Sequence, residues 1–247
     1  MLVLILLATF IASIVSLFIV TGLLLIKKPG KSITLALTSF ATGVLLATAF
    51  LDLFPQALAQ AIDKSGIFIW SLGGMVIFFL FEQFFHWYHN HRAHGNLTPS
   101  VLLITFGDGL HNFIDGIAIA ASFLTNVQLG VATSIAVFAH EIPHEIADVS
   151  VYIHQGVSKK KTILFNAGSG LTALLGALLT FFFAAKFHDF LPAINAFTAG
   201  NFIYIAGSDL IPELHHATEN STKHWKIAGM FLLGIFLMRG LQIFLGE

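Results

Sequence analysis

The sequence predicts an all-α polytopic membrane protein with eight transmembrane helices in an inverted 3+2+3 repeat arrangement. Three observations predict it. Hydrophobic residues make up 56% of the 247 residues and charged residues only 10%, against about 25% charged in soluble domains. Apolar stretches long enough to cross a bilayer recur along the whole chain, and two of them share a motif. We expect a single transmembrane domain over residues 1–247, with lipid and not nucleic acid around it.

The expected spans cover residues 2–26, 33–60, 66–88, 99–124, 128–155, 162–185, 190–214 and 226–245. The first stretch is too long for the apolar core of a signal peptide, has no basic segment before it, and is followed by Lys27-Lys28. We therefore interpret it as a retained span. The chain has no cysteine, which excludes disulfides and thiolate metal sites.

The basic residues predict the orientation in the membrane. Connections after spans one, three, five and seven hold nine of them: Lys27, Lys28, Lys31, Arg92, Lys159, Lys160, Lys161, Lys223 and Lys226. The remaining connections hold only Lys64 and Lys186. Since basic loops stay in the cytoplasm, we expect both termini outside it, in an integral protein of the plasma or inner membrane.

The second and seventh spans carry a repeated motif. Phe40-Ala41-Thr42-Gly43 and Asp52-Leu53-Phe54-Pro55-Gln56 in span two match Phe197-Thr198-Ala199-Gly200 and Asp209-Leu210-Ile211-Pro212-Glu213 in span seven, each 157 positions later. In the expected topology the two spans run in opposite directions. Inverted repeats are a common plan of secondary transporters, so we group spans one to three against six to eight, with four and five between them.

The fourth and fifth spans carry the candidate metal ligands. His111 and Asp115 share one face of a helix at a spacing of four, as do His140 and His144. A short connection makes the two spans antiparallel neighbours, and facing helices of this kind build bundle metal sites. Three imidazoles and a carboxylate suit Zn²⁺, although Fe²⁺, Mn²⁺ or Co²⁺ also accept them. Asn112 and Glu141 point to neighbouring positions and could hold a second ion or solvate the first.

Acids dominate the interior of the expected spans, where Arg239 is the single cation. Ionisable residues at this depth are costly and indicate function. The acids suggest a cation pathway with lower-ranked candidates at Asp52, Asp108, Glu145, Asp148, Asp209 and Glu213. Glu82 could either bond to a neighbouring helix or have a functional role, and the sequence leaves both interpretations open. The histidines near the third connection, His86, His89, His91 and His94, could bind metal weakly or form a polar loop.

The chain resembles the ZIP (Zrt/Irt-like) divalent metal transporters in two motifs, HNFIDG from His111 to Gly116 and HEIPHEIAD from His140 to Asp148. It is most similar to the branch with His-Glu-x-Pro-His-Glu-x-Gly-Asp on the fifth span. The resemblance implies that zinc, or iron, manganese or cadmium, moves toward the cytoplasm as substrate and not as cofactor. It implies a primary site of His111, Asp115, His140 and His144, a secondary site of Asn112 and Glu141, and an elevator-like motion.

The chain departs from that family pattern at two positions. Ala147 stands where the branch has Gly, and Ala173 stands where some members have a Glu that bridges two metals. We therefore expect one principal ion. The glycines at Gly73-Gly74 and Gly168-Ser169-Gly170 indicate close helix approach, either within one chain or in a homodimer, and both remain open.

Other functions fit parts of the pattern. His140-Glu141-Ile142-Pro143-His144 matches the H-E-x-x-H motif of zinc proteases, so an intramembrane metalloprotease is the main alternative. Pro143 is unusual in such a helix, and a protease leaves the acids of spans two and seven unexplained. A haem carrier with axial His111 and His140 conflicts with the surrounding carboxylates. A proton-coupled cation exchanger does not need three convergent histidines. We expect a transporter and not an enzyme.

Overall fold

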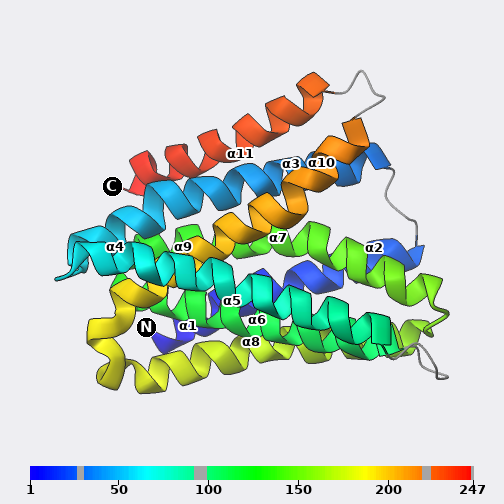
Figure 1. Ribbon diagram of the computed structural model, residues 1–247, viewed down its shortest axis with the longest axis horizontal. Coiled ribbons are helices and arrows are strands. Elements are labelled where there is room, and N and C mark those ends of the chain that lie inside the picture. The colour runs from blue at the N-terminus through cyan, green and yellow to red at the C-terminus, as the bar shows by residue number, and fades with distance from the viewer. Residues whose placement is uncertain (27–30, 92–98, 219–223, 246–247) are drawn as a thin grey trace.

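The helices follow the predicted apolar stretches closely. The computed structural model describes residues 1–26, 31–91, 99–218 and 224–245, and within these ranges every regular element is a helix (Figure 1). The elements are α1 (Leu2–Thr9), η1 (Phe10–Val15), α2 (Ser16–Ile26), α3 (Lys31–Ala47), η2 (Thr48–Leu53), α4 (Phe54–Gln60), α5 (Lys64–His91), α6 (Pro99–Thr125), α7 (Val127–His154), α8 (Lys159–Phe187), η3 (His188–Phe190), α9 (Leu191–Ile205), η4 (Ala206–Leu210), α10 (Ile211–Thr218) and α11 (His224–Leu245). The all-α fold class is confirmed.

Several helices are long and apolar enough to cross a membrane. Within the described part of the chain these are five segments: Leu2–Gly22, Ser32–Gln60, Lys64–Phe84, Lys159–Phe183 and His224–Phe244. They correspond to predicted spans one, two, three, six and eight. The chain is therefore an integral membrane protein, and eight crossings remain the prediction.

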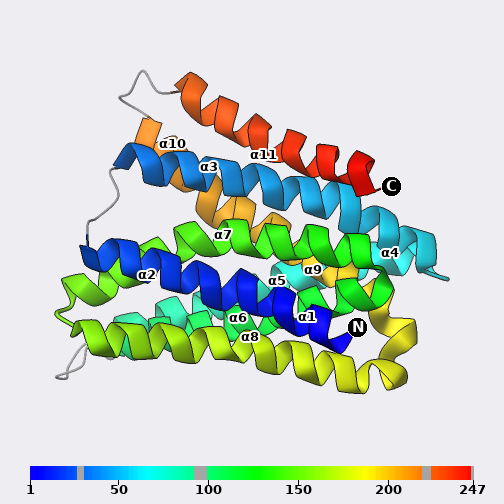
Figure 2. The ribbon, with the colours of Figure 1, turned by 180° about the vertical axis from the view of Figure 1, so that it is seen from behind.

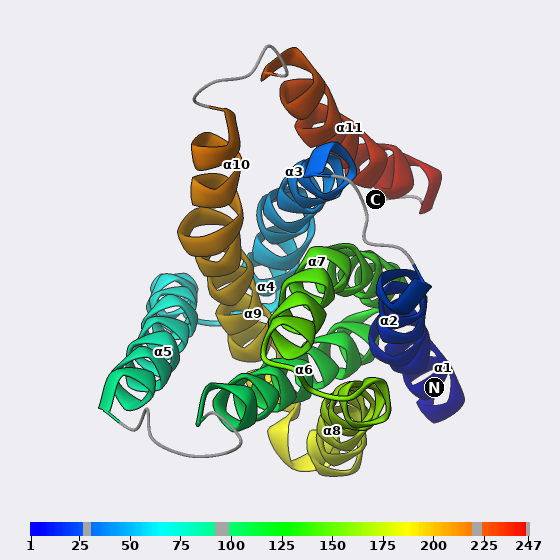
Figure 3. The same cartoon turned by 90° about the vertical axis from the view of Figure 1, so that its right-hand side faces the viewer.

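Helices α6 and α7 lie in the middle of the bundle. In the view along its long axis, α8 and the α1–α2 helix cover one side of this pair, and α3 and α9 cover the other (Figure 3). Helices α5 and α11 lie at the periphery, where α5 packs on α9 and α11 packs on α3. The polar stretches of spans four and five are therefore shielded by the more apolar helices around them.

The ends of the helices separate into two sets. Both termini lie at one end of the molecule (Figures 1 and 2). The end of α7 and the start of α8, with Lys159, Lys160 and Lys161, lie at the opposite end, as do the facing ends of α2 and α3, α5 and α6, and α10 and α11. The described helix ends that adjoin the basic connections therefore share one end of the molecule, and the orientation in the membrane stays a prediction.

Helices α3 and α11 pack closely at glycines, and so do helices α5 and α9. The contacts of the two pairs involve equivalent positions of the expected repeat. A Cβ on Gly43 of α3 would meet the carbonyl oxygen of Phe231, and one on Gly234 of α11 would meet that of Phe40. In the second pair, Gly200 of α9 meets the carbonyl of Ser71, and Gly74 of α5 meets that of Phe197. Phe40 and Gly43 are separated from Phe197 and Gly200 by the same 157 positions as the sequence motif. These contacts agree with the inverted repeat, which stays a prediction.

Gly74→Ala is expected to destabilise the protein, whereas Gly73→Ala is not. The new methyl group of Gly74→Ala would lie under 3.0 Å from the Phe197 carbonyl oxygen, and at Gly73 nothing lies within 4 Å. Overpacking of this kind costs about 1–3 kcal/mol, while the gain in helix propensity is the same for both substitutions. Thermal unfolding of the two purified variants in detergent measures the difference. Equal midpoints would contradict this close packing of α5 on α9.

A π-helical segment interrupts α3 before Pro55, a feature that the sequence did not predict. Proline has no N–H to donate to the carbonyl four residues earlier, which here is Leu51. The Nε2 of Gln242 on α11 donates to this carbonyl at 2.5 Å and to Oδ1 of Asp52 at 2.6 Å. Asp52, predicted as a pathway residue, is thus held by a neighbouring helix.

Candidate metal centre

A one-residue connection fixes α6 and α7 as antiparallel neighbours. Oδ1 of Asn126 accepts a hydrogen bond from the backbone N–H of Leu129 at 2.7 Å and caps the first turn of α7. The ring of Phe123 occupies the space that a Cβ on Gly130 would need. The tight turn therefore sets which residues of the two helices lie at the same depth.

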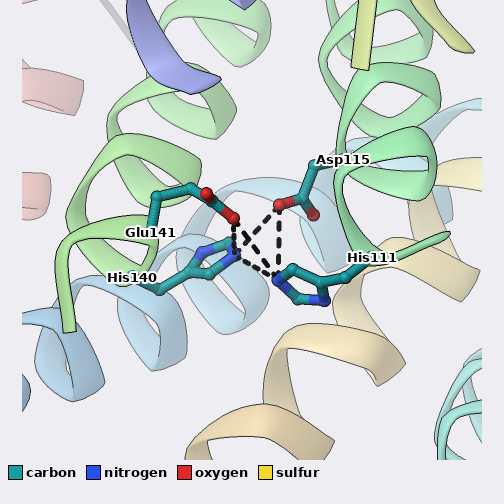
Figure 4. Close-up of side chains that lie close together, drawn as sticks. All are labelled: His111, Asp115, His140 and Glu141. Atoms are coloured by element: carbon teal, nitrogen blue, oxygen red, sulfur yellow. Dashed lines mark hydrogen bonds and ion pairs between the residues drawn. The ribbon is translucent and has the colours of Figure 1, made fainter. Parts of the chain in front are cut away.

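Four side chains from the facing turns converge in a buried group, which we call the central site: His111 and Asp115 of α6, and His140 and Glu141 of α7 (Figure 4). Each contributes one potential ligand atom, and these atoms all lie within 4.8 Å of one another. The Nε2 of His140 lies 3.0 Å from Oδ2 of Asp115 and 3.1 Å from Nε2 of His111. Oε1 of Glu141 lies 3.6 Å from Nε2 of His111. Two nitrogens and two oxygens thus face a common centre.

A hydrogen bond fixes the orientation of the His140 ring. Its Nδ1 lies 3.0 Å from the carbonyl oxygen of Ala136. Because a carbonyl can only accept, we assign the ring proton to Nδ1, which leaves the lone pair of Nε2 directed at the centre. Such a bond on the second ring nitrogen is the usual support of a metal-binding histidine.

Three of the four carboxylate oxygens of the central site have no hydrogen-bond partner among the described residues. Both oxygens of Glu141 and Oδ1 of Asp115 are buried without a hydrogen-bond partner in the described part of the chain. Phe78 and Phe202 place ring edges against His111 and His140, with centroid distances of 5.9 and 5.7 Å. Burying unsatisfied carboxylates in apolar surroundings is costly, and a bound cation would remove that cost.

A second group lies on the adjacent turns. Asp108 of α6 and His144 and Asp148 of α7 also bring one potential ligand atom each within 4.8 Å of the others. The ring of His144 stacks on that of His111, with centroids 4.8 Å apart and an angle of 8° between the planes. His144, predicted in the primary set, therefore adjoins the central site, while its ligand groups with the two aspartates. Asn112, predicted in the secondary site, donates from Nδ2 to Oδ1 of Asp108 at 2.9 Å.

Two other predicted pathway residues, Glu145 and Glu213, belong to neither group. Oε2 of Glu145 accepts a hydrogen bond at 2.7 Å from Asn166 of α8, whose amide nitrogen is also 3.1 Å from Thr21. Glu213 is exposed on α10. The side chains of Asp209, His86, His89 and His91, and the whole of His94, lie outside the described residues.

Comparison with known proteins identifies the family. The family profile described as ZIP Zinc transporter matches residues 1–100 and 93–242. The chain belongs to the ZIP zinc transporter family. Zinc transporter ZIP10 of Danio rerio is 37% identical over 143 residues, covering 58% of this chain and 17% of that protein. Zinc transporter ZIP6 of Homo sapiens is 40% identical over 149 residues, with 58% and 20% covered.

Zinc transporter ZIP4 of Mus musculus is 30% identical over 253 residues, covering 73% of this chain and 38% of that protein. The chain thus spans well under half the length of these relatives. ZIP proteins form a transport family and not an enzyme family. The geometry also disfavours a protease, because the two histidines of H-E-x-x-H should bind the same metal, whereas here His140 and His144 fall into different groups.

The departure at span six has a structural counterpart. Ala173 is fully buried, and its carbonyl oxygen lies where a Cβ on Gly116 of α6 would be. Helices α6 and α8 therefore approach closely beside the central site. Position 173 therefore offers no carboxylate to the central site, whose ligands come from α6 and α7.

Proposed function

We propose that this chain carries divalent metal cations, zinc first, across a membrane toward the cytoplasm, and that the central site is where the ion binds. The convergence of four buried ligand atoms, two of them on carboxylates with unsatisfied oxygens, is the observation that carries the proposal. His111, Asp115, His140 and Glu141 would hold the ion. His144 and Asn112 adjoin them and would take part as it moves.

Family membership and the donor types support zinc as substrate. Two imidazoles and two carboxylates form a set that suits Zn²⁺ in tetrahedral geometry, while Fe²⁺, Mn²⁺ and Cd²⁺ are the other candidates. The relatives of this chain are named as zinc transporters. The ion is cargo here, and no cofactor is required for this function.

Movement toward the cytoplasm is the second part of the proposal, and the expected orientation says which end of the molecule the ion would leave from. The helix ends beside the basic connections lie together at the end opposite to the termini. By the positive-inside rule this end faces the cytoplasm, so both termini would lie outside, in the plasma or inner membrane. An ion that enters from the side of the termini would shed water, bind at the central site, and leave past Asp108 and Asp148.

Zinc uptake should be reduced by competing Cd²⁺ and hardly changed by Mg²⁺. Imidazole nitrogens suit zinc and its softer relatives, whereas Mg²⁺ prefers oxygen ligands and keeps its waters. Uptake of labelled Zn²⁺ into liposomes that contain the purified protein tests this prediction, with protein-free liposomes as control. We expect saturable uptake that equimolar Cd²⁺ reduces by about half or more. Uptake no faster than in protein-free liposomes, or equal competition by Mg²⁺, would contradict the proposal.

A further inference from the structure

We propose that Asp108, His144 and Asp148 form a second, weaker cation site, the release site, which takes a divalent metal after the central site. This inference rests on the proposed function and specifies the step that follows binding. Three ligand atoms, one from each residue, lie within 4.8 Å of one another. They come from the same two helices as the central site, and together the two sites form a continuous line of ligands.

The surroundings of Asp108 suit a cation ligand. The residue is only 3% exposed. Oδ1 accepts the hydrogen bond from Asn112, which fixes the carboxylate, while Oδ2 is buried and has no hydrogen-bond partner in the part of the chain that the structure describes. An unsatisfied carboxylate oxygen at this depth is costly. A metal ion shared with Asp148 and His144 would satisfy it and would also offset the repulsion between the two carboxylates.

The depth of the release site follows from the helix register. Asp108 precedes His111 on α6, and His144 and Asp148 follow His140 on α7, so the two antiparallel helices offset this group in the same direction. At about 1.5 Å per residue, the two groups of ligands are separated by roughly 8 Å along the helices. The offset is toward the end of the molecule that we expect to face the cytoplasm.

The release site is less enclosed than the central site. The side chains of His144 and Asp148 are 33% and 14% exposed, whereas those of Asp115 and Glu141 are 0% exposed. It also offers three ligand atoms instead of four. Fewer ligands and more exposure predict weaker binding, which is what a site on the exit side needs, since conduction requires the ion to leave.

His144 connects the two sites. Its ring stacks on His111 of the central site, and its Nδ1 lies 3.8 Å from Oδ2 of Asp148. Beyond the release site, the hydroxyls of Thr105 and Tyr152 hydrogen-bond at 2.8 Å between α6 and α7. An ion in the release site is thus bounded by the stacked histidines on one side and by this hydrogen bond on the other.

Equilibrium binding of Zn²⁺ alone to the purified full chain in detergent tests the release site, with calorimetric stoichiometry as the readout. We expect two ions for the unmodified protein, the second bound at least about ten-fold more weakly than the first. The double variant Asp108→Asn/Asp148→Asn should bind one ion with the affinity of the central site. His140→Ala should keep the weaker ion. Asp63→Asn, which removes an exposed carboxylate at the start of α5, should still bind two.

A single ion for the unmodified protein, or an unchanged second ion in the double variant, would overturn the release site. If the double variant does not fold, Asp148→Asn alone decides, since loss of the weaker ion supports the site and its retention overturns it. Flux measured on the same proteins separates the two proposals. Two bound ions without transport would refute the proposed function and keep the site, and transport with one bound ion would do the reverse.

Discussion

Replacing His140 with Ala is expected to weaken zinc binding by at least about 100-fold and to abolish measurable uptake. The Nε2 of His140 on α7 lies close to both potential ligands on α6, 3.0 Å from Oδ2 of Asp115 and 3.1 Å from Nε2 of His111. Loss of a residue that merely supports a ligand costs about 10–100-fold in metal affinity, and loss of a ligand should cost more. Zinc titration of the purified variant, followed by uptake in liposomes, measures both effects.

His224→Ala is the matched control for this variant. His224 is exposed at the start of α11, away from the α6–α7 pair, so its loss should change neither affinity nor uptake by more than about two-fold. If His140→Ala binds zinc as tightly as His224→Ala does, the central site is not where the ion binds.

Glu141→Gln should remove most zinc uptake while making the metal-free protein more stable. The substitution keeps the shape of the side chain and removes a buried carboxylate, neither oxygen of which has a hydrogen-bond partner among the residues that the structure describes. Removal of such a charge is expected to stabilise the empty fold. The variant should also lose most of its stabilisation by zinc, which for the unmodified protein reaches about 2.7 kcal/mol at a zinc concentration of 100 times Kd. Thermal unfolding with and without zinc measures both changes.

Glu145→Gln provides the comparison on the next turn of α7. In the sequence the two glutamates look equivalent, because each follows a histidine of the motif. Oε2 of Glu145 accepts a hydrogen bond from Asn166, so this carboxylate is already engaged outside the central site. We expect Glu145→Gln to retain stabilisation by zinc. Equal losses in both variants would refute the assignment of Glu141 as the ligand.

The sequence was sufficient to predict where the helices lie and that α6 and α7, which carry the candidate site, are neighbours. Apolar length alone predicts where helices form in a membrane, and for this reason the helices follow the eight predicted stretches. The spacing of four placed His111 with Asp115 on one face, and the structure brings both to the central site. The short connection at Asn126 also made α6 and α7 neighbours, as expected from its length.

The sequence could not decide which residues of α7 meet the ligands of α6. Helix spacing alone puts His140 and His144 on one face, with Glu141 about 100° away around the axis. The rotation of α7 against α6 is set by packing with α2, α3 and α8, and it brings Glu141 in and places the ligand of His144 with the aspartates. One-dimensional spacing contains no information on that rotation.

The sequence also could not predict side-chain contacts between helices that are far apart along the chain. Gln242 bonds to Asp52 across 190 positions, and Asn166 bonds to Glu145 across 21. Neither residue belongs to a motif. The only available signal was that Gln242 is a polar residue in an apolar span, near Arg239, the single cation expected in the interior. In the structure, Nη1 of Arg239 donates to Oε1 of Gln242 at 2.9 Å.

Uptake of labelled Zn²⁺ into liposomes by the double variant His111→Ala/His140→Ala, at the same amount of inserted protein as His224→Ala, tests the central claim most directly. The double variant removes both imidazole ligands of the central site and changes no residue outside α6 and α7. We predict saturable uptake by His224→Ala and the rate of protein-free liposomes for the double variant. Saturable uptake by a correctly folded double variant would show that zinc crosses the membrane by a route other than the α6–α7 site.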